Sequence, residues 1–250
     1  TFKPGIYSNR SSRASRGRYV DGNLVRFRDD VPGQIGGWLT PPYVGAAIAG
    51  VPRGIIAWRP NSQTQRFFGV GTHSNAYQCD GSLVSDITPV PFTAGRVDSI
   101  YGSGYGTSTY SLSSYGSART GGSSVLDAST WTFDTFGETV LGMFSGDGIL
   151  YEYTAGTDPR YVAVTGAPTG RAMLVSAERH VFILGTNNYP NRVDWSDREN
   201  RNDWTPSAIN RAGFYELQTA SALQCGKRCR GQVIIWSQTD VFALAPLSSS

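Results

Sequence analysis

Residues 140–154, VLGMFSGDGILYEYT, show the pattern on which the fold of this chain depends. Two runs of apolar and aromatic residues flank a small polar turn, SGDG, at residues 145–148. Glycine and aspartate tolerate the backbone angles of a tight turn, and the side-chain period is two rather than 3.6. The stretch therefore predicts a β-hairpin.

Three further stretches repeat this order of strand, polar turn and strand: RFFGVGTHSNAYQCD from Arg66, HVFILGTNNYPNRVDWS from His180 and QVIIWSQTDVFALA from Gln232. The four turns begin at residues 72, 145, 186 and 237, so they are 73, 41 and 51 residues apart. A further strand candidate precedes each hairpin, at residues 54–58, 130–133, 172–175 and 221–224. Three or four strands per unit at such a period are typical of propeller blades, which must stack to bury both faces.

The composition agrees with an all-β fold. The chain of 250 residues contains 30 glycines and 13 tyrosines, and lysine occurs only at Lys3 and Lys227, so helical Glu–Lys ladders are absent. We therefore expect an all-β, β-propeller-like fold with repeated antiparallel blades over residues 41–250. Because the sequence stops soon after a strand candidate, we expect the propeller to be incomplete at its C-terminus.

Residues 18–38, RYVDGNLVRFRDDVPGQIGGW, predict a separate N-terminal arm and three-stranded β-meander within residues 1–40. Val25 and Phe27 alternate with charged residues, so they point to one face and serve, with Trp38, as expected core anchors. We expect strands at residues 18–20, 24–28 and 34–39, separated by turns at residues 21–22 and 29–33.

Positive charge gathers in the same N-terminal segment. Residues 1–40 contain seven basic and three acidic side chains, whereas the net charge of the whole chain is only +3. A basic arm is suited to docking on an acidic partner or on nucleic acid, and solvated surface charge is an equally good interpretation.

A second unusual segment, residues 101–124, is rich in Tyr, Gly and Ser and poor in aliphatic residues. It is either a flexible surface loop or a loop ordered by contact with another subunit.

Sequence motifs for catalysis are missing. No nucleophile elbow, P-loop, zincin helix or Rossmann glycine pattern occurs, and Cys79, Cys225 and Cys229 lack the spacing of a zinc knuckle or disulfide framework. We therefore expect reduced thiols, no cofactor, no metal and no enzymatic activity. No apolar run approaches the length of a membrane span and no secretory signal is evident, so a soluble protein is expected.

Carboxylates are the remaining candidates for chemistry, because some propellers cleave glycosides with paired acids. None of the acids stands out as a pair; they are Asp134, Glu138, Asp147, Glu152, Asp194, Asp197 and Glu216. Residues 194–204, DWSDRENRNDW, are expected to form a hydrogen-bonded loop between strands that holds two tryptophans. Calcium binding by the oxygen ligands of this loop stays open as the alternative.

Four stretches in colinear order resemble the tail nozzle proteins of short-tailed phages, also called tail accessory, hub or packaged-DNA stabilisation proteins. They are residues 18–38, the Tyr-Gly repeats of residues 101–116, TWTFDTFGETVLG from Thr130 and NRVDWSDRENRNDWTPSAINRAGFYELQ from Asn191. The resemblance extends over most of the chain, from about Pro4 to Leu244.

The resemblance implies a β-propeller subunit of a hexameric ring below the portal and adaptor proteins of the virion, assembled in the host cytoplasm. Such a ring extends the DNA channel without sequence-specific binding, retains the packaged genome and anchors tail fibres or spikes. The side chains expected at subunit or adaptor interfaces are Arg13, Arg16, Arg18, Arg26, Arg28, Tyr101, Tyr105, Tyr110 and Tyr115. A carbohydrate-binding or glycoside-cleaving propeller is the main alternative, and a protein-interaction propeller is a third.

Overall fold

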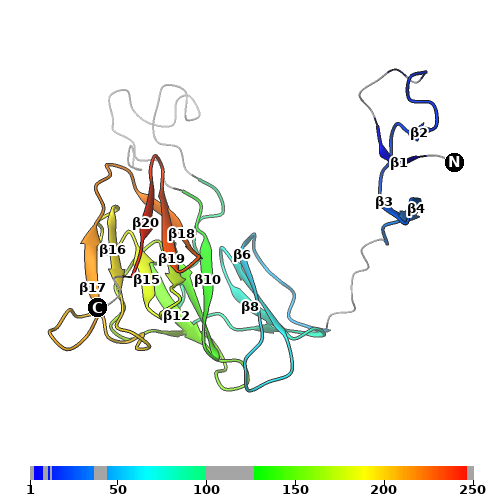
Figure 1. Ribbon diagram of the computed structural model, residues 1–250. Helices are drawn as coiled ribbons and strands as arrows, with labels where there is room; N and C mark the ends of the chain where they lie inside the picture. The colour runs from blue at the N-terminus through cyan, green and yellow to red at the C-terminus, as the bar shows by residue number, and fades with distance from the viewer. Residues whose placement is uncertain (1–2, 8–10, 12, 37–43, 100–126, 247–250) are drawn as a thin grey trace, which may run out of the picture. The chain divides into compact units, whose positions relative to one another are not determined.

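The computed structural model describes residues 3–7, 11, 13–36, 44–99 and 127–246, and these residues form strands, turns and loops without any helix (Figure 1). The described residues therefore contain no helix that is long and apolar enough to cross a membrane. The chain divides into two compact units, Thr1–Pro42 and Tyr43–Ser250.

The second unit begins with a five-stranded sheet, blade 1, in the order β5-β9-β8-β7-β6. All neighbouring strands pair antiparallel except β5 and β9, which pair parallel. The strands are β5 (Val44–Gly45), β6 (Pro52–Trp58), β7 (Phe67–Thr72), β8 (Ala76–Cys79) and β9 (Leu83–Asp86).

Three antiparallel sheets follow, each with its strands in sequence order. Blade 2 contains β10 (Trp131–Phe136), β11 (Thr139–Phe144), β12 (Ile149–Tyr153) and β13 (Val162–Ala163). Blade 3 contains β14 (Ala172–Val175), β15 (Val181–Leu184), β16 (Arg192–Trp195) and β17 (Gly213–Glu216). Blade 4 contains β18 (Leu223–Cys229), β19 (Gln232–Ser237) and β20 (Val241–Leu244). All four predicted hairpins are confirmed, and a strand precedes each of them. The fourth of these strands, expected over residues 221–224, begins at Leu223 and continues to Cys229.

Successive blades pack face to face. The contacts between them centre on their first strands, β6 with β10, β10 with β14 and β14 with β18. Each junction encloses one apolar cluster, which includes Trp58 and Trp131 at the first junction, Met143 and Ile183 at the second, and Leu174 and Ile235 at the third. The fold is therefore all-β and β-propeller-like, built of repeated antiparallel blades.

The outer strands of the blades were not predicted. β13 and β17 are short, and most of their side chains are exposed, so they lack the apolar runs that mark a strand in a sequence. β9 has a single buried residue, Val84, and β5 has none. Their positions depend on pairing with the neighbouring strand rather than on an apolar pattern of their own.

The N-terminal unit does not form the predicted meander. β1 (Lys3–Ile6) pairs parallel with β2 (Arg18–Tyr19), and β3 (Val25–Arg28) pairs antiparallel with β4 (Val31–Gln34). The prediction that β2 continues into β3 as one sheet is therefore wrong. The strand expected over residues 34–39 lies earlier, at Val31–Gln34; residues 35 and 36 are in no strand, and residues 37–39 lie outside the described part of the chain.

The second turn explains part of this difference. It consists of Asp29 and Asp30 alone, with φ values of 50° and 64°, the left-handed conformation of a two-residue hairpin turn. Pro32 and Gly33 consequently belong to β4, and the strand begins earlier than expected. The predicted alternation of β3 is confirmed, since Val25 and Phe27 are half-buried and Arg26 and Arg28 exposed. Trp38 lies outside the described residues.

Candidate functional site

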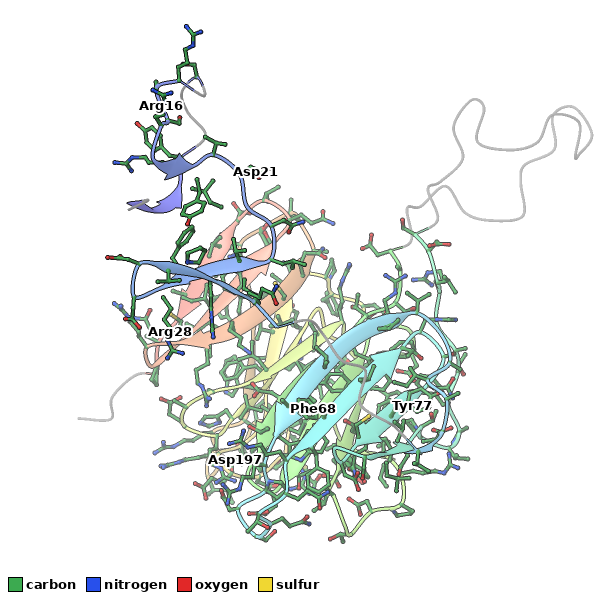
Figure 2. All side chains as sticks on the ribbon, turned by 90° about the vertical axis from the view of Figure 1, so that its right-hand side faces the viewer. Arg16, Asp21, Arg28, Phe68, Tyr77 and Asp197 are labelled. Carbon is green, nitrogen blue, oxygen red and sulfur yellow. The ribbon has the colours of Figure 1, made fainter. Side chains whose placement is uncertain are left out.

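The five arginines predicted at an interface are all exposed in the N-terminal unit: Arg13, Arg16, Arg18, Arg26 and Arg28. Figure 2 shows Arg16 beside the β1-β2 pair and Arg28 on the β3-β4 hairpin. The guanidinium carbon of Arg18 lies 5.1 Å from the centre of the Tyr7 ring, within the range of a cation–π contact. The four predicted tyrosines, Tyr101, Tyr105, Tyr110 and Tyr115, lie outside the described residues.

Asp134 connects two blades. Its Oδ2 accepts a hydrogen bond from the backbone N–H of Val175 at 3.0 Å, and Oγ1 of the nearby Thr132 accepts one from the N–H of Met173, also at 3.0 Å. Met173 and Val175 belong to β14, the edge strand of blade 3, so these two side chains of β10 satisfy backbone donors that the sheet leaves free. This brace explains two polar residues within the stretch TWTFDTF.

Three further candidate acids have similar structural partners. Glu138 accepts hydrogen bonds from Ser62 Oγ at 2.8 Å and from the backbone N–H of Ser62 and of Asn61, and these bonds lower the pKa of Glu138. Glu152 forms an ion pair with Arg201, which joins blade 2 to the β16–β17 loop. The third is Asp194, which is ion-paired with Arg192 at 2.6 Å. Glu216, another candidate acid, is exposed at the end of β17.

The loop between β16 and β17 is hydrogen-bonded, as predicted. Trp195 Nε1 donates to the carbonyl of Arg211 at 2.8 Å, and Trp204 Nε1 donates to the carbonyl of Arg201 at 2.7 Å. Both tryptophans are half-buried. Asp197 Oδ1 accepts from the N–H of Arg211 at 2.8 Å, and backbone hydrogen bonds lower the pKa of Asp197. Within the described parts of the chain, no three His, Cys, Asp or Glu side chains gather as ligands for a metal ion.

A polar pocket of about 440 Å³ lies between blades 2 and 3, at the β11–β12 turn. Asp147 lines it, and burial raises the pKa of its carboxyl, which accepts a hydrogen bond from Tyr151 at 2.7 Å. Asp127 and Arg171, which form an ion pair, are also in its lining. Such a pocket offers donors and acceptors to a polar ligand. The sequence pattern missed it because Asp127 and Asp147 belong to different segments.

A second pocket, of about 500 Å³, lies between blades 3 and 4 and is mainly apolar. Phe182 and Trp195 contribute rings whose centroids are 5.9 Å apart. His180 also lines it, with Nδ1 2.9 Å from the carbonyl oxygen of Ser196. Because a carbonyl oxygen only accepts, Nδ1 carries the proton, and in the neutral ring Nε2 is the acceptor.

The three cysteines are free thiols, as predicted. Cys79 is buried in blade 1, and burial raises the pKa of its thiol above the ordinary value. Cys225 and Cys229 are exposed on β18. An exposed thiol of this kind is available to a chemical cross-linker.

No protein-family model and no curated protein matches the chain, whereas similar folds occur among solved structures. The structure of YCF48 bound to a D1 peptide superposes with a TM-score of 0.48 at 11% sequence identity. The match covers 89% of this chain and 56% of the YCF48 chain, so this chain spans little more than half the length of that protein. The class of the protein, an all-β protein with propeller-like blades, follows from its own sheets.

Proposed function

We propose that this chain is a structural component of a phage tail, a subunit of a hexameric nozzle ring below the portal and adaptor proteins. In this role the ring extends the DNA channel, retains the packaged genome and anchors fibres or spikes. The proposal starts from the four stretches that resemble tail nozzle proteins, and it makes the protein a virion component rather than an enzyme.

The observation that carries the proposal is the structural use of the side chains in these stretches. In TWTFDTF, Trp131 packs at the first blade junction and Asp134 braces the second. In DWSDRENRNDW, Asp197 holds the β16–β17 loop closed through the N–H of Arg211. Aspartates, which act as catalytic acids in many enzymes, therefore stabilise the blades and their loops here, as expected of a structural subunit.

The charge distribution supports the same role. Residues 1–40 have seven basic and three acidic side chains, a surplus of +4, so residues 41–250, with 15 basic and 16 acidic side chains, have a net charge of −1. A near-neutral body suits a conduit through which DNA slides, because tight phosphate contacts would hold the DNA back. The exposed arginines of the N-terminal unit suit contacts with other subunits or the adaptor, since arginine is enriched at interface hot spots.

Electron microscopy of the purified protein tests this function. We expect rings with a central channel wide enough for a DNA duplex. Replacing Arg13, Arg16 and Arg18 together by alanine is expected to weaken assembly or adaptor docking, whereas replacing the exposed Arg198 in blade 3 is the matched control. Particles without a channel would contradict the proposal, and unchanged assembly of the triple variant would remove the role of the arm.

A carbohydrate-binding or glycoside-cleaving propeller is a second candidate because of one observation, the Asp147 pocket. A carboxyl with a raised pKa is suited to donate a proton to a leaving group. Its neighbour in the pocket lining, Asp127, is ion-paired with Arg171. Binding to a glycan array that is lost in Asp147→Asn would favour this candidate over the nozzle.

A further inference from the structure

The first strands of blades 1, 2 and 3 end beside the next blade, and one position there differs among the blades. Trp58 ends β6 and Phe136 ends β10; each pairs with the first residue of the following strand and is buried. Ser176 has the same place in blade 3, because it follows β14 directly and its N–H donates to the carbonyl of His180 at 2.9 Å. Blade 3 therefore has a small polar side chain where the two preceding blades have a large aromatic one.

At the junction of blades 2 and 3, the Phe136 side chain fills the space at this position. It belongs to the apolar cluster of that junction, and the guanidinium carbons of Arg179 and Arg201 lie 4.9 and 5.8 Å from the centre of its aromatic ring. Ser176 cannot fill the corresponding space between blades 3 and 4, where the mainly apolar pocket of about 500 Å³ lies. We name this space the junction pocket; its lining includes Ser176, His180, Phe182, Trp195, Val233 and Leu244.

Two pairs of neighbouring residues form the apolar walls of the junction pocket. On blade 3, Phe182 of β15 pairs with Trp195 of β16, and both are half-buried. On blade 4, Val233 of β19 pairs with Leu244 of β20. Paired residues lie side by side on one face of a sheet, so an aromatic surface and an aliphatic surface bound the same space. Such walls favour a flat apolar ligand, which can stack on the aromatic side.

The size of the junction pocket also suits a small ligand. Small-molecule sites have volumes of about 300–1,000 Å³, with apolar walls and a few polar groups that fix the orientation of the ligand. Protein interiors otherwise contain few voids larger than a water molecule. Because Phe136 shows that a larger side chain is accommodated at this position of a blade, packing alone does not account for the space.

His180 supplies a hydrogen-bond acceptor in this apolar setting. Its Nδ1 carries the proton, since it lies 2.9 Å from the carbonyl oxygen of Ser196, so Nε2 of the neutral imidazole accepts. No residue in the described part of the chain donates to Nε2. His180 is two positions before Phe182 and therefore lies on the side of the sheet that faces the pocket. A ligand with a donor satisfies this nitrogen, whereas one without leaves it unpaired.

We propose that the junction pocket binds a small planar aromatic ligand with one N–H or O–H donor, which is directed at Nε2 of His180. Phe182 and Trp195 contact the plane of this ligand. The ligand is expected to be neutral, because the two charged side chains in the lining, Glu178 and Arg211, have opposite signs. Such a site is additional to the proposed function and does not depend on assembly into a nozzle.

Indole and indene form a matched pair of probes for the wild-type chain. Both have the same fused, flat shape, but only indole has an N–H donor. We expect isothermal titration calorimetry to show about 10-fold tighter binding of indole, because only indole satisfies the acceptor. Absence of indole binding at millimolar concentration, or equal affinity for the two probes, would overturn the proposal.

The same chemistry occurs in a free aromatic molecule and in a tryptophan side chain of a partner protein. N-acetyltryptophanamide, in which the indole group is attached to a short polypeptide backbone, distinguishes these two sources. Affinity equal to that of indole supports a protein side chain as the occupant of the pocket. Much weaker binding than that of indole supports a free ligand.

Ser176→Phe tests the location of the site. The introduced side chain corresponds to Phe136 of blade 2, so it is expected to fill the pocket and to weaken indole binding by about 10-fold or more. Circular dichroism confirms that the variant is folded. Ser82→Phe, at an exposed position in the β8–β9 turn of blade 1, is the matched control and should bind indole as the wild type does. A folded Ser176→Phe chain with wild-type affinity would overturn the proposal.

His180→Asn tests the acceptor. The asparagine amide keeps an N–H that reaches the carbonyl of Ser196 in place of Nδ1, but it has no counterpart of Nε2. We expect this variant to lose the preference for indole and to bind both probes about as weakly as the wild type binds indene. A purely structural role of His180 would change both affinities alike, so a preference for indole that persists in His180→Asn would contradict the proposed hydrogen bond.

Discussion

The N-terminal unit and the blades use the same local elements and bury very different amounts of side chain. In blade 2, all six residues of β11 are buried, on both faces of the strand. In β3 of the N-terminal unit, Val25 and Phe27 are half-buried, and the side chains between them are exposed. Among the described residues of that unit, only Ser15 is buried.

This difference shows that alternation and tight turns alone do not make a core. A two-stranded hairpin is at most marginally stable in water, because one of its faces always remains open. In the blades, stacking covers the second face, so the stability of each hairpin depends on its neighbours. The four predictions below test this difference, from the largest expected effect to the smallest.

Removing Trp131 is expected to give the largest loss. Its ring stacks on Phe133 with centroids 5.3 Å apart, and its Nε1 donates to the carbonyl of Thr72 in blade 1 at 2.8 Å. Trp131→Ala should lower the free energy of unfolding by about 3–5 kcal/mol in urea titrations followed by circular dichroism.

The matched change in the other unit is Phe27→Ala. Because Phe27 is half-buried and lies in the N-terminal unit, with its ring 5.4 Å from that of Tyr19, we expect the main unfolding transition to change by less than about 0.5 kcal/mol. Equal losses in the two variants would show that the two units do not differ as described.

The Asp134 brace is expected to give an intermediate effect. Asp134→Ala leaves the N–H of Val175 without its partner, which should cost about 1–3 kcal/mol. Asp134→Asn keeps an oxygen that accepts this bond and should lose clearly less. Equal losses in the two variants, measured by the same titration, would show that the carboxylate does not act through this hydrogen bond.

The sequence predicts those features of the fold that depend on residues close together in the chain, and it misses those that depend on residues far apart. The hairpin turns at Ser145 and Ser237 depend on residues next to them, so the sequence places them correctly. The brace from Asp134 to Val175 joins residues 41 positions apart, and the lining of the polar pocket combines Asp127 with Asp147 across two strands. No periodic pattern contains that information.

The predicted meander of the N-terminal unit was wrong for a different reason. Val31, Pro32 and Gly33 read as a turn, yet the chain turns at Asp29 and Asp30, whose short side chains tolerate positive φ values. Pro32 can then occupy β4 because a two-stranded sheet has only edge strands, where a missing N–H is tolerated. Turn residues alone did not show which pair would form the turn.

Acid is expected to weaken the β16–β17 loop. Hydrogen bonds, first that from the N–H of Arg211, lower the pKa of Asp197 in the folded protein below its ordinary value of 3.8. The group therefore contributes stability above pH 3.8, and this contribution is lost as the pH falls through the lowered pKa. Asp197→Asn, which cannot ionise, should show a shallower fall of Tm with acid in differential scanning calorimetry. Parallel Tm curves for the two proteins would contradict this role.

The smallest effect on the blades is expected from the turn of the N-terminal hairpin. Asp29 and Asp30 both have positive φ values, for which Asn-Gly is the favoured pair in a two-residue turn. The double variant with Asp29→Asn and Asp30→Gly should stabilise the β3-β4 hairpin by about 0.5–1 kcal/mol, seen as slower amide hydrogen exchange in both strands. Because stacking rather than turn chemistry stabilises the blades, their Tm should stay unchanged. A rise in the blade Tm would mean that the two units unfold together, and the contrast between them would then be one of burial alone.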